Sequence, residues 1–304
     1  MSRYDELTRA LAARVVDGPL APGTALPSVR RLAADEGSSP ATVRRAYLAL
    51  ERAGVVVLSE RRAARVAPGG ELAARRLLRA GAAFRLAGSD DPALAVLLEA
   101  VGGEIVAVGA SGSFRGLTAL WRGDADGAAL HLRHRDGGYN VPFARALLAG
   151  RDPVVVHLWQ REQGLIVPPG NPRRLRDAAA LARARVAQRP RGTGTRTLLD
   201  HLAIEAGAEP GAIAGPEVEL HLDVAIAVAT GEADTGLGLR SAALAFGLDF
   251  VPLVSEPFEV MTTRAQVGGL EPMLRALARS DVRERVESLG GYDLTRAGEI
   301  VAAS

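Results

Sequence analysis

Residues 26–54 constrain the fold more than any other stretch, because they hold two short amphipathic helical patterns around a tight turn, LPSVRRLAADEGSSPATVRRAYLALERAG. Ser28 is a good N-cap for the first helix. Its inward-facing residues are then Val29, Leu32 and Ala33. Gly37 supplies the positive φ that a sharp helix-to-helix turn requires.

The second helix of this pair is predicted to begin at Pro40, with Ser39 as its N-cap. One apolar face follows at i, i+3, i+4 and i+7, formed by Val43, Ala46, Tyr47 and Leu50. Arginines occupy the faces that this core does not use. A helix exposed in this way is the layout that a helix-turn-helix presents to the major groove of DNA.

The flanking residues extend the pattern. Leu7, Leu11 and Val15 recur four apart and predict a helix over residues 5–17. Residues 55–57 are three valines that predict a strand, and residues 65–66 a return strand, so that together they form a hairpin wing.

Charge is distributed unevenly along the 304 residues. Residues 1–67 contain 11 arginines and 7 acidic residues, whereas the rest of the chain contains 26 arginines and 28 acidic residues. The basic excess therefore falls on the amino-terminal part, as nucleic-acid binding requires.

The wording ALPSVRRLA and TVRRAYLAL resembles the GntR family of winged helix-turn-helix regulators over about residues 5–66. The resemblance implies a DNA-binding domain over residues 1–67. It implies contacts to phosphates and bases of double-stranded operator DNA by Arg30, Thr42, Arg44 and Arg45. The wing departs from the family, because SERRAARVAP replaces a glycine-rich tip; Arg61 and Arg62 are the candidates there.

Pro68, Gly69 and Gly70 then break the chain, and a linker helix is predicted over residues 68–81. Two interpretations stay open for it: it transmits a signal between the flanking domains, or it is an inert spacer.

From residue 82 onward strands alternate with helices, which is typical of an α/β fold with parallel strands. Three strand-to-helix junctions carry small hydroxyl residues or glycines where the helix begins, in LAGSDDPAL, GASGSFRG and PRGTGTRT. Helix N-termini expose free N–H groups and a partial positive charge, so such junctions favour anions.

The order of these pieces resembles the type 2 periplasmic-binding-protein fold, on the wording GSDDPAL, REQGLIVPPGNP, RGTGTRTLLD, GEADTGLGLRSAA and LGGYD. The resemblance implies a bilobed ligand-binding domain over residues 82–304. Lobe 1 would hold about 82–160 and 255–304, and lobe 2 about 162–252. Relatives of this fold include molybdate and tungstate binders, in which hydroxyls at helix starts surround the oxyanion.

By junction position, the ligand-binding candidates are Ser89, Ser111, Ser113, Thr193, Gly194, Thr195, Arg196 and Arg240. A small oxyanion is the first candidate ligand. A small organic acid is the alternative, with Arg196 or Arg240 pairing its carboxylate. Asp90 stands where the family often has histidine, and an acid there would repel an anion if it faced the ligand.

Other chemistries find little support. The chain has no cysteine and no lysine, which excludes disulfides, thiolate metal sites and a pyridoxal-phosphate aldimine. His131 and His134 are the only closely spaced histidines, with no third ligand evident. We therefore expect no enzyme activity, no cofactor and no metal; an enzyme on the bilobed fold and a transport protein are the alternatives.

The amino terminus is polar and no apolar run reaches membrane-spanning length. We expect a cytoplasmic, homodimeric, ligand-responsive transcription regulator with no membrane partner. The expected fold class is α/β with an N-terminal winged helix-turn-helix and a C-terminal bilobed type 2 periplasmic-binding-protein-like domain.

Overall fold

The computed structural model describes residues 3–18, 20–59, 63–78 and 83–302. The side chains of residues 110, 111 and 302 also lie outside this description. The chain divides into two compact units, Met1–Ala82 and Ala83–Ser304.

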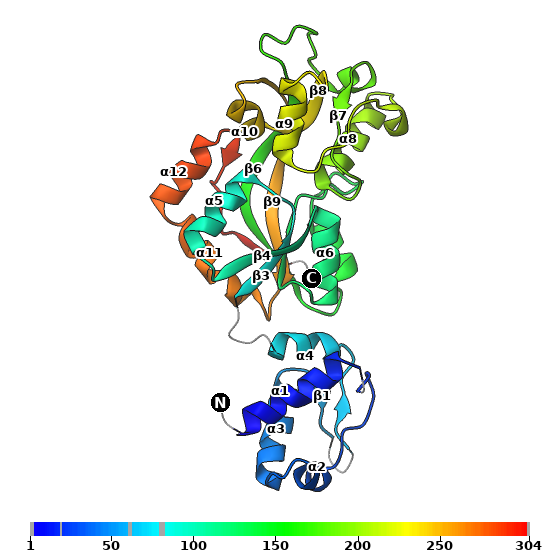
Figure 1. Ribbon diagram of the computed structural model, residues 1–304, viewed down its shortest axis with the longest axis vertical. Coiled ribbons are helices and arrows are strands. Elements are labelled where there is room, and N and C mark those ends of the chain that lie inside the picture. The colour runs from blue at the N-terminus through cyan, green and yellow to red at the C-terminus, as the bar shows by residue number, and fades with distance from the viewer. Residues whose placement is uncertain (1–2, 19, 60–62, 79–82, 303–304) are drawn as a thin grey trace. The chain divides into compact units, whose positions relative to one another are not determined.

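The N-terminal unit is a helical domain with a short two-stranded hairpin (Figure 1). Its helices are α1 (Arg3–Val16), α2 (Val29–Asp35), α3 (Pro40–Arg52) and α4 (Gly70–Leu78). Strands β1 (Val56–Val57) and β2 (Arg65–Val66) pair antiparallel, which confirms the predicted wing strands.

The predicted caps of the two central helices are present. Ser28 Oγ accepts a hydrogen bond from the Arg31 N–H at the start of α2. Ser39 Oγ accepts one from the Thr42 N–H at the start of α3. Gly37 has a φ of +57° in the turn between them, a conformation that glycine adopts at little cost.

Helix α4 belongs to this N-terminal unit. Ala74 is fully buried in the core that also holds Leu11, Leu32 and Leu50. Leu77 and Leu78 pack against the same core. The helix predicted as a linker therefore contributes apolar contacts to the DNA-binding domain, and residues 79–82 after it lie outside the described part of the chain.

The C-terminal unit is built on a nine-stranded sheet with the order β4-β3-β5-β9-β6-β8-β7, and β10 and β11 pair with β6. The strands are β3 (Phe84–Gly88), β4 (Ile105–Ser111), β5 (Gly127–Leu130), β6 (Pro153–Val167), β7 (Val186–Ala187), β8 (Thr235–Leu239), β9 (Asp249–Thr263), β10 (Tyr292–Asp293) and β11 (Ile300–Ala302).

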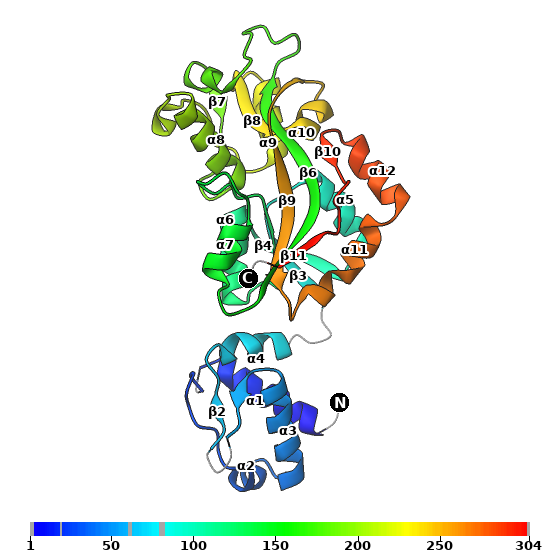
Figure 2. The same ribbon diagram turned by 180° about the vertical axis from the view of Figure 1, so that it is seen from behind.

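Two long antiparallel strands, β6 and β9, run through the whole unit (Figure 2). At one end they join the parallel strands β3, β4 and β5, and at the other end they join β8 and β7. We call the part around β3, β4 and β5 lobe 1, and the part around β7 and β8 lobe 2.

Helices cover both faces of the sheet in each lobe. In lobe 1 they are α5 (Pro92–Val101), α11 (Glu271–Leu277) and α12 (Ser280–Ser288) over one face, and α6 (Ser113–Arg122) and α7 (Val141–Leu147) over the other. In lobe 2 they are α8 (Gly194–Glu205) over one face, and α9 (His221–Ala229) and α10 (Arg240–Ala245) over the other. Short 3-10 turns occupy Ala178–Ala182, Pro210–Ala212 and Val267–Leu270.

Strand alternation explains these two-sided cores. Val154 and Val156 of β6 pack toward α5, whereas Val155 between them packs toward α6. Since successive side chains of a strand point to opposite faces, a continuous apolar run is the pattern that a doubly covered strand requires.

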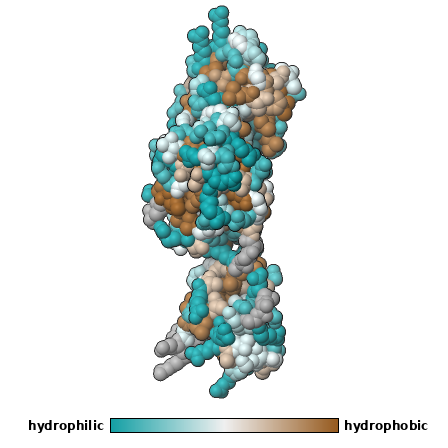
Figure 3. All heavy atoms as spheres, turned by 90° about the vertical axis from the view of Figure 1, so that its left-hand side faces the viewer, coloured by the Kyte–Doolittle hydropathy of each residue, from teal (hydrophilic) through white to brown (hydrophobic). Residues whose placement is uncertain are grey.

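Within the described residues, no helix is long and apolar enough to cross a membrane. Exposed large apolar side chains lie on or beside α9 and α10, at Leu222, Ile226, Leu244 and Phe246. Figure 3 shows hydrophobic areas among hydrophilic ones on one face of the molecule.

Candidate functional site

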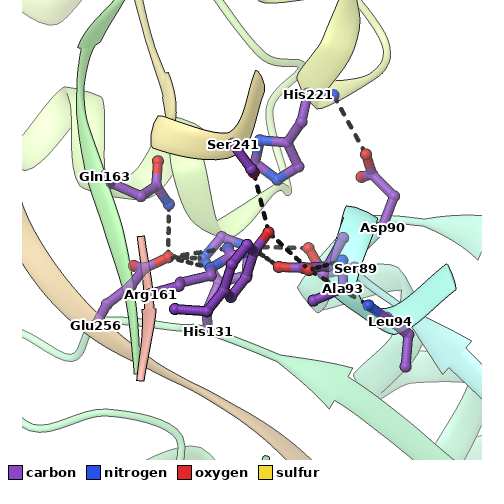
Figure 4. A network of polar contacts seen from close by, with 12 residues as sticks. Ser89, Asp90, Ala93, Leu94, His131, Arg161, Gln163, His221, Ser241 and Glu256 are labelled. Atoms are coloured by element: carbon purple, nitrogen blue, oxygen red, sulfur yellow. Dashed lines mark hydrogen bonds and ion pairs between the residues drawn. The ribbon is translucent and has the colours of Figure 1, made fainter. Parts of the chain in front are cut away.

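A buried polar network lies where the two lobes meet, and its centre is the ion pair between Arg161 of β6 and Glu256 of β9 (Figure 4). Arg161 donates to Glu256 Oε1 from Nε at 3.0 Å and from Nη2 at 2.9 Å. It also donates from Nη1 to Asp91 Oδ2 at 2.5 Å. The three side chains are fully buried, and the Phe258 ring lies 4.6 Å from the guanidinium.

The loop after β3 carries lobe 1 residues into this network. Asp91 caps α5, because its Oδ1 accepts from the Ala93 N–H at 2.8 Å. Ser89 Oγ lies 2.9 Å from His131 Nε2, and the other ring nitrogen of His131 lies 2.9 Å from Glu256 Oε1.

Burial and mutual attraction set the protonation of this group. Burial and the positive charge of Arg161 lower the pKa of His131, and Glu256 only partly offsets them. Burial alone would raise the pKa of Glu256. The attraction of the Arg161 guanidinium and the hydrogen bonds from His131 and Gln163 outweigh this effect and lower the pKa of Glu256 to about 2. Glu256 is therefore ionised at neutral pH and His131 is neutral.

Lobe 2 contributes Arg189, which follows β7, and His221, the first residue of α9. The Arg189 side chain is 1% exposed and donates from Nη2 to Asp90 Oδ1 at 2.7 Å. The backbone N–H of His221 donates to Asp90 Oδ2 at 3.3 Å. The His221 and His131 rings lie 6.3 Å apart.

His221 is neutral as well. Burial lowers the pKa of His221 well below the usual value; the attraction of Asp90 opposes this effect, and the nearby positive charges of Arg189 and Arg161 add to it.

Several buried polar atoms here have no hydrogen-bond partner among the described residues. They include Nε and Nη1 of Arg189 and both ring nitrogens of His221. Gln163 uses its Nε2 to reach Glu256 Oε1 and Thr195 Oγ1, but its Oε1 lacks a partner. Because buried polar groups are nearly always hydrogen-bonded, unpaired donors and acceptors concentrated at one place indicate a site that accepts a polar ligand or water.

Close packing brings the lobes together around this site. The Phe114 N–H donates to the Gly192 carbonyl at 3.2 Å. A Cβ on Gly194 would lie 2.5 Å from His131 Cε1. The two lobes are therefore in direct contact here, with α6 of lobe 1 against the start of α8 in lobe 2.

The predicted ligand residues divide into two sets. Ser89, Gly194 and Thr195 lie in the network, and Ser113 Oγ accepts from the His131 N–H at 3.4 Å beside it. Thr193 caps α8, with its Oγ1 accepting from the Arg196 N–H. The side chain of Ser111 lies outside the described residues.

The two predicted arginines have other partners. Arg196 pairs with Asp200 one turn along α8, at 2.8 Å. Arg240 pairs with Glu162 and lies over the Phe250 ring. The guanidinium that has unpaired nitrogens in the network is instead that of Arg189.

Several residues of the network were not predicted as ligand-binding residues from the sequence, namely Arg161, Gln163, Arg189, Glu256 and His221. The signal for the first two was present, because Arg161 and Gln163 interrupt a long apolar strand. A buried charge is costly unless it is paired, so charged residues inside such a run predict a partner on a neighbouring strand. Among the described residues, no group of three or more His, Cys, Asp or Glu side chains could hold a metal ion.

In the N-terminal unit, Arg30, Arg44 and Arg45 are exposed and Thr42 is half-buried. Arg45 lies over the Tyr4 ring, with its guanidinium carbon 4.3 Å from the ring centre. The Thr42 hydroxyl lies 2.8 Å from Ser39 Oγ. Arg61 and Arg62 fall outside the described residues.

Comparison with protein families decides what these units are. Residues 97–278 match the family model described as a PBP superfamily domain, and residues 3–66 match that of the bacterial regulatory proteins of the gntR family. The chain belongs to the PBP superfamily and carries a GntR-family DNA-binding domain. Both fold predictions, the winged helix-turn-helix and the α/β binding-protein domain, are thereby confirmed.

Relatives with similar sequences include the Bacillus subtilis (strain 168) protein YvgK, 30% identical over 195 residues. That match covers 62% of this chain and spans 63% of YvgK. A Clostridium pasteurianum protein from the 5′ region of a 2Fe-2S ferredoxin gene is 33% identical over 111 residues, which are 34% of this chain and 96% of that protein.

Among solved structures, the sulfate-binding protein SubI from Mycobacterium tuberculosis H37Rv matches with a TM-score of 0.50 and 12% identity, over 70% of this chain and 87% of SubI. A mutant of Corynebacterium glutamicum OxyR matches with a TM-score of 0.49 and 14% identity, over 94% of each chain. At this identity the likeness to SubI concerns the fold alone.

Proposed function

We propose that this GntR-type regulator changes its DNA binding when a small anionic ligand binds between the two lobes of its PBP-superfamily domain. One observation carries the proposal. Arg189 is buried where the two lobes meet and keeps Nε and Nη1 without a hydrogen-bond partner among the described residues, close to a histidine whose two ring nitrogens are also without one.

Arg189 suits an anionic group for a physical reason. A guanidinium is always charged and presents several N–H donors in one plane, which matches carboxylates and other oxyanions. The hydroxyls of Ser89 and Thr195 lie in the same network and can turn toward a ligand.

Two ligand classes fit this donor set. A tetrahedral oxyanion such as molybdate or tungstate uses the arginine and the hydroxyls. A small organic acid places its carboxylate on Arg189 and offers hydrogen-bond donors of its own to neighbouring acceptors.

The charge of the network favours the organic acid. Asp90, Asp91 and Glu256 face Arg161 and Arg189, and burial keeps both histidines neutral. With three carboxylates and two guanidiniums, the buried network already carries one net negative charge. A dianion would add two more, which costs free energy unless protons are taken up.

At the N-terminal unit, we propose that Arg30, Thr42, Arg44 and Arg45 bind operator DNA, with Arg61 and Arg62 as wing contacts. Exposed arginines on α2 and α3 support this assignment. We also propose that the regulator is a homodimer, since two heads are needed to bind two half-sites of one operator.

The test has two stages. Thermal unfolding is first measured with molybdate, tungstate, sulfate and a set of small carboxylates, because a ligand that binds the folded state raises the apparent Tm. DNA affinity for the region upstream of its own gene is then measured with and without each ligand that binds. No Tm shift with any anion at millimolar concentration, or a shift without any change in DNA affinity, would refute the proposal.

A further inference from the structure

Asp90 forms an ion pair between the two lobes. Its carboxylate belongs to the loop between β3 and α5 in lobe 1, whereas both of its hydrogen-bond donors, Arg189 Nη2 and the His221 N–H, belong to lobe 2. We call this arrangement of Asp90, Arg189 and the His221 N–H the Asp90 bridge.

The place of this carboxylate is that of an anion. The His221 N–H is the first of α9, and helix N-termini carry free N–H groups with a partial positive charge. The carboxylate and the helix start lie side by side in Figure 4. The Asp90 carboxylate therefore occupies a position at the start of α9 that would otherwise attract an anion from solution.

We propose that the Asp90 bridge holds the cleft closed in the protein without ligand, so that Asp90 acts as a built-in anion with which the ligand must share Arg189. This inference rests on the proposed function for its biological role, but the bridge itself can be tested without a ligand.

Exposure supports a role at the rim of the cleft. The Asp90 side chain is 27% exposed, whereas Arg189 is 1% exposed. The carboxylate thus reaches solvent on one side, whereas Nε and Nη1 of the arginine are buried and have no hydrogen-bond partner among the described residues. A ligand anion can occupy these nitrogens while Asp90 keeps Nη2.

The charge of the bridge persists across the physiological pH range. Burial raises the pKa of Asp90, but the attraction of the Arg189 guanidinium and the hydrogen bonds from Arg189 and the His221 N–H outweigh it, so that the pKa lies well below its usual range. The other charged or titratable groups close to His221 are Arg161 and His131.

A test follows from the absence of cysteine in the chain. Ala95 on α5 and Ala229 on α9 are both exposed, in lobe 1 and lobe 2 respectively. Replacing both by cysteine allows two spin labels to report the distance between the lobes in the full-length protein, without ligand or DNA.

We expect one short distance for the labelled parent and a second, longer one after Asp90→Asn. The closed-to-open ratio should fall about tenfold, as expected for losing a charged hydrogen-bonded contact. Asp90→Ala is the second variant, and a Tm measurement verifies that each variant is folded.

The matched control is Asp126→Asn. Asp126 pairs with Arg85 at 3.0 Å, the two side chains are 14% and 16% exposed, and both residues lie in lobe 1. This variant should lower the Tm and leave the distance distribution unchanged.

The inference is overturned if folded Asp90→Asn and Asp90→Ala proteins keep the parent distances, or if Asp126→Asn opens the cleft equally. If Asp90→Asn lengthens the distance between the lobes but no anion raises the Tm of the parent protein, the proposed function is refuted and this inference is not.

Discussion

Gly194 lies against His131 so closely that a Cβ at position 194 would come within 2.5 Å of the imidazole Cε1 and 2.7 Å of the His131 carbonyl oxygen. Gly194 begins α8 in lobe 2, and His131 follows β5 in lobe 1. The contact between the lobes therefore depends on a residue without a side chain.

Gly194→Ala should accordingly force the lobes apart. We expect the spin-label distance between positions 95 and 229 to lengthen, and the free energy of unfolding to fall by about 1–3 kcal/mol, as for overpacking. Gly211→Ala is the control, because nothing lies within 4 Å of a Cβ at that lobe 2 position. Parent-like distances in Gly194→Ala would show that the closed contact can relax locally.

Arg189→Gln should abolish ligand binding, because it removes the charge that the proposed anion pairs with. We expect the Kd of any anion that shifts the parent Tm to rise at least about 100-fold, the size of a lost charged hydrogen bond at a buried site. Isothermal titration calorimetry measures it. Arg173→Gln is the control, since that arginine lies on the surface of lobe 2 and pairs with Asp234; equal losses in both variants would contradict the assignment.

Arg44→Ala should weaken DNA binding both with and without ligand, because Arg44 belongs to the proposed DNA-binding surface. If Arg44 contacts a phosphate, affinity falls for all sequences and the slope of log K against log salt decreases by about 1. Fluorescence anisotropy over a salt series measures both quantities. Arg279→Ala is the comparison, because that exposed arginine pairs with Asp281 in the C-terminal unit. An unchanged slope together with lost preference for one sequence would indicate a base contact instead.

Buried neutral histidines make stability depend on pH between 7 and 5. In the unfolded chain His221 takes up a proton below its ordinary pKa of 6.5, whereas in the folded protein its pKa lies well below that value. Acidification therefore favours the unfolded state, by up to about 2 kcal/mol per such histidine at pH 5. His221→Gln should lose less stability than the parent between pH 7 and 5 in urea titrations, and an identical loss would show that His221 protonates in the folded protein.

Glu256 also makes the fold less stable on acidification, but at lower pH than His221. Its folded pKa of about 2 is below the ordinary 4.5, so its stabilising contribution is complete above pH 4.5 and is lost as the pH falls toward 2. Glu256→Gln should therefore be less stable than the parent at pH 6, by about 3–5 kcal/mol because Arg161 loses its buried partner. The difference should narrow at pH 3; a constant difference would mean that charge is not the cause.

Much of the fold could be predicted from the sequence because the controlling interactions are local. Ser28, Ser39 and Gly37 act on the backbone within one turn of themselves, so their capping and turn roles follow from position alone. The alternation of strands and helices after residue 82 likewise indicated an α/β fold, since periodicity is a property of each segment.

Only the tertiary structure decided which side chains form the candidate site. Junction position led to Ser89, Gly194 and Thr195, which do lie in the network, but it also led to Arg196 and Arg240, whose carboxylate partners Asp200 and Glu162 lie elsewhere. Arg161 and Glu256 are 95 residues apart, and Asp90 and Arg189 are 99 apart. Local pattern carries no information about such pairs, because the register of β6 against β9 and the closing of one lobe on the other bring them together.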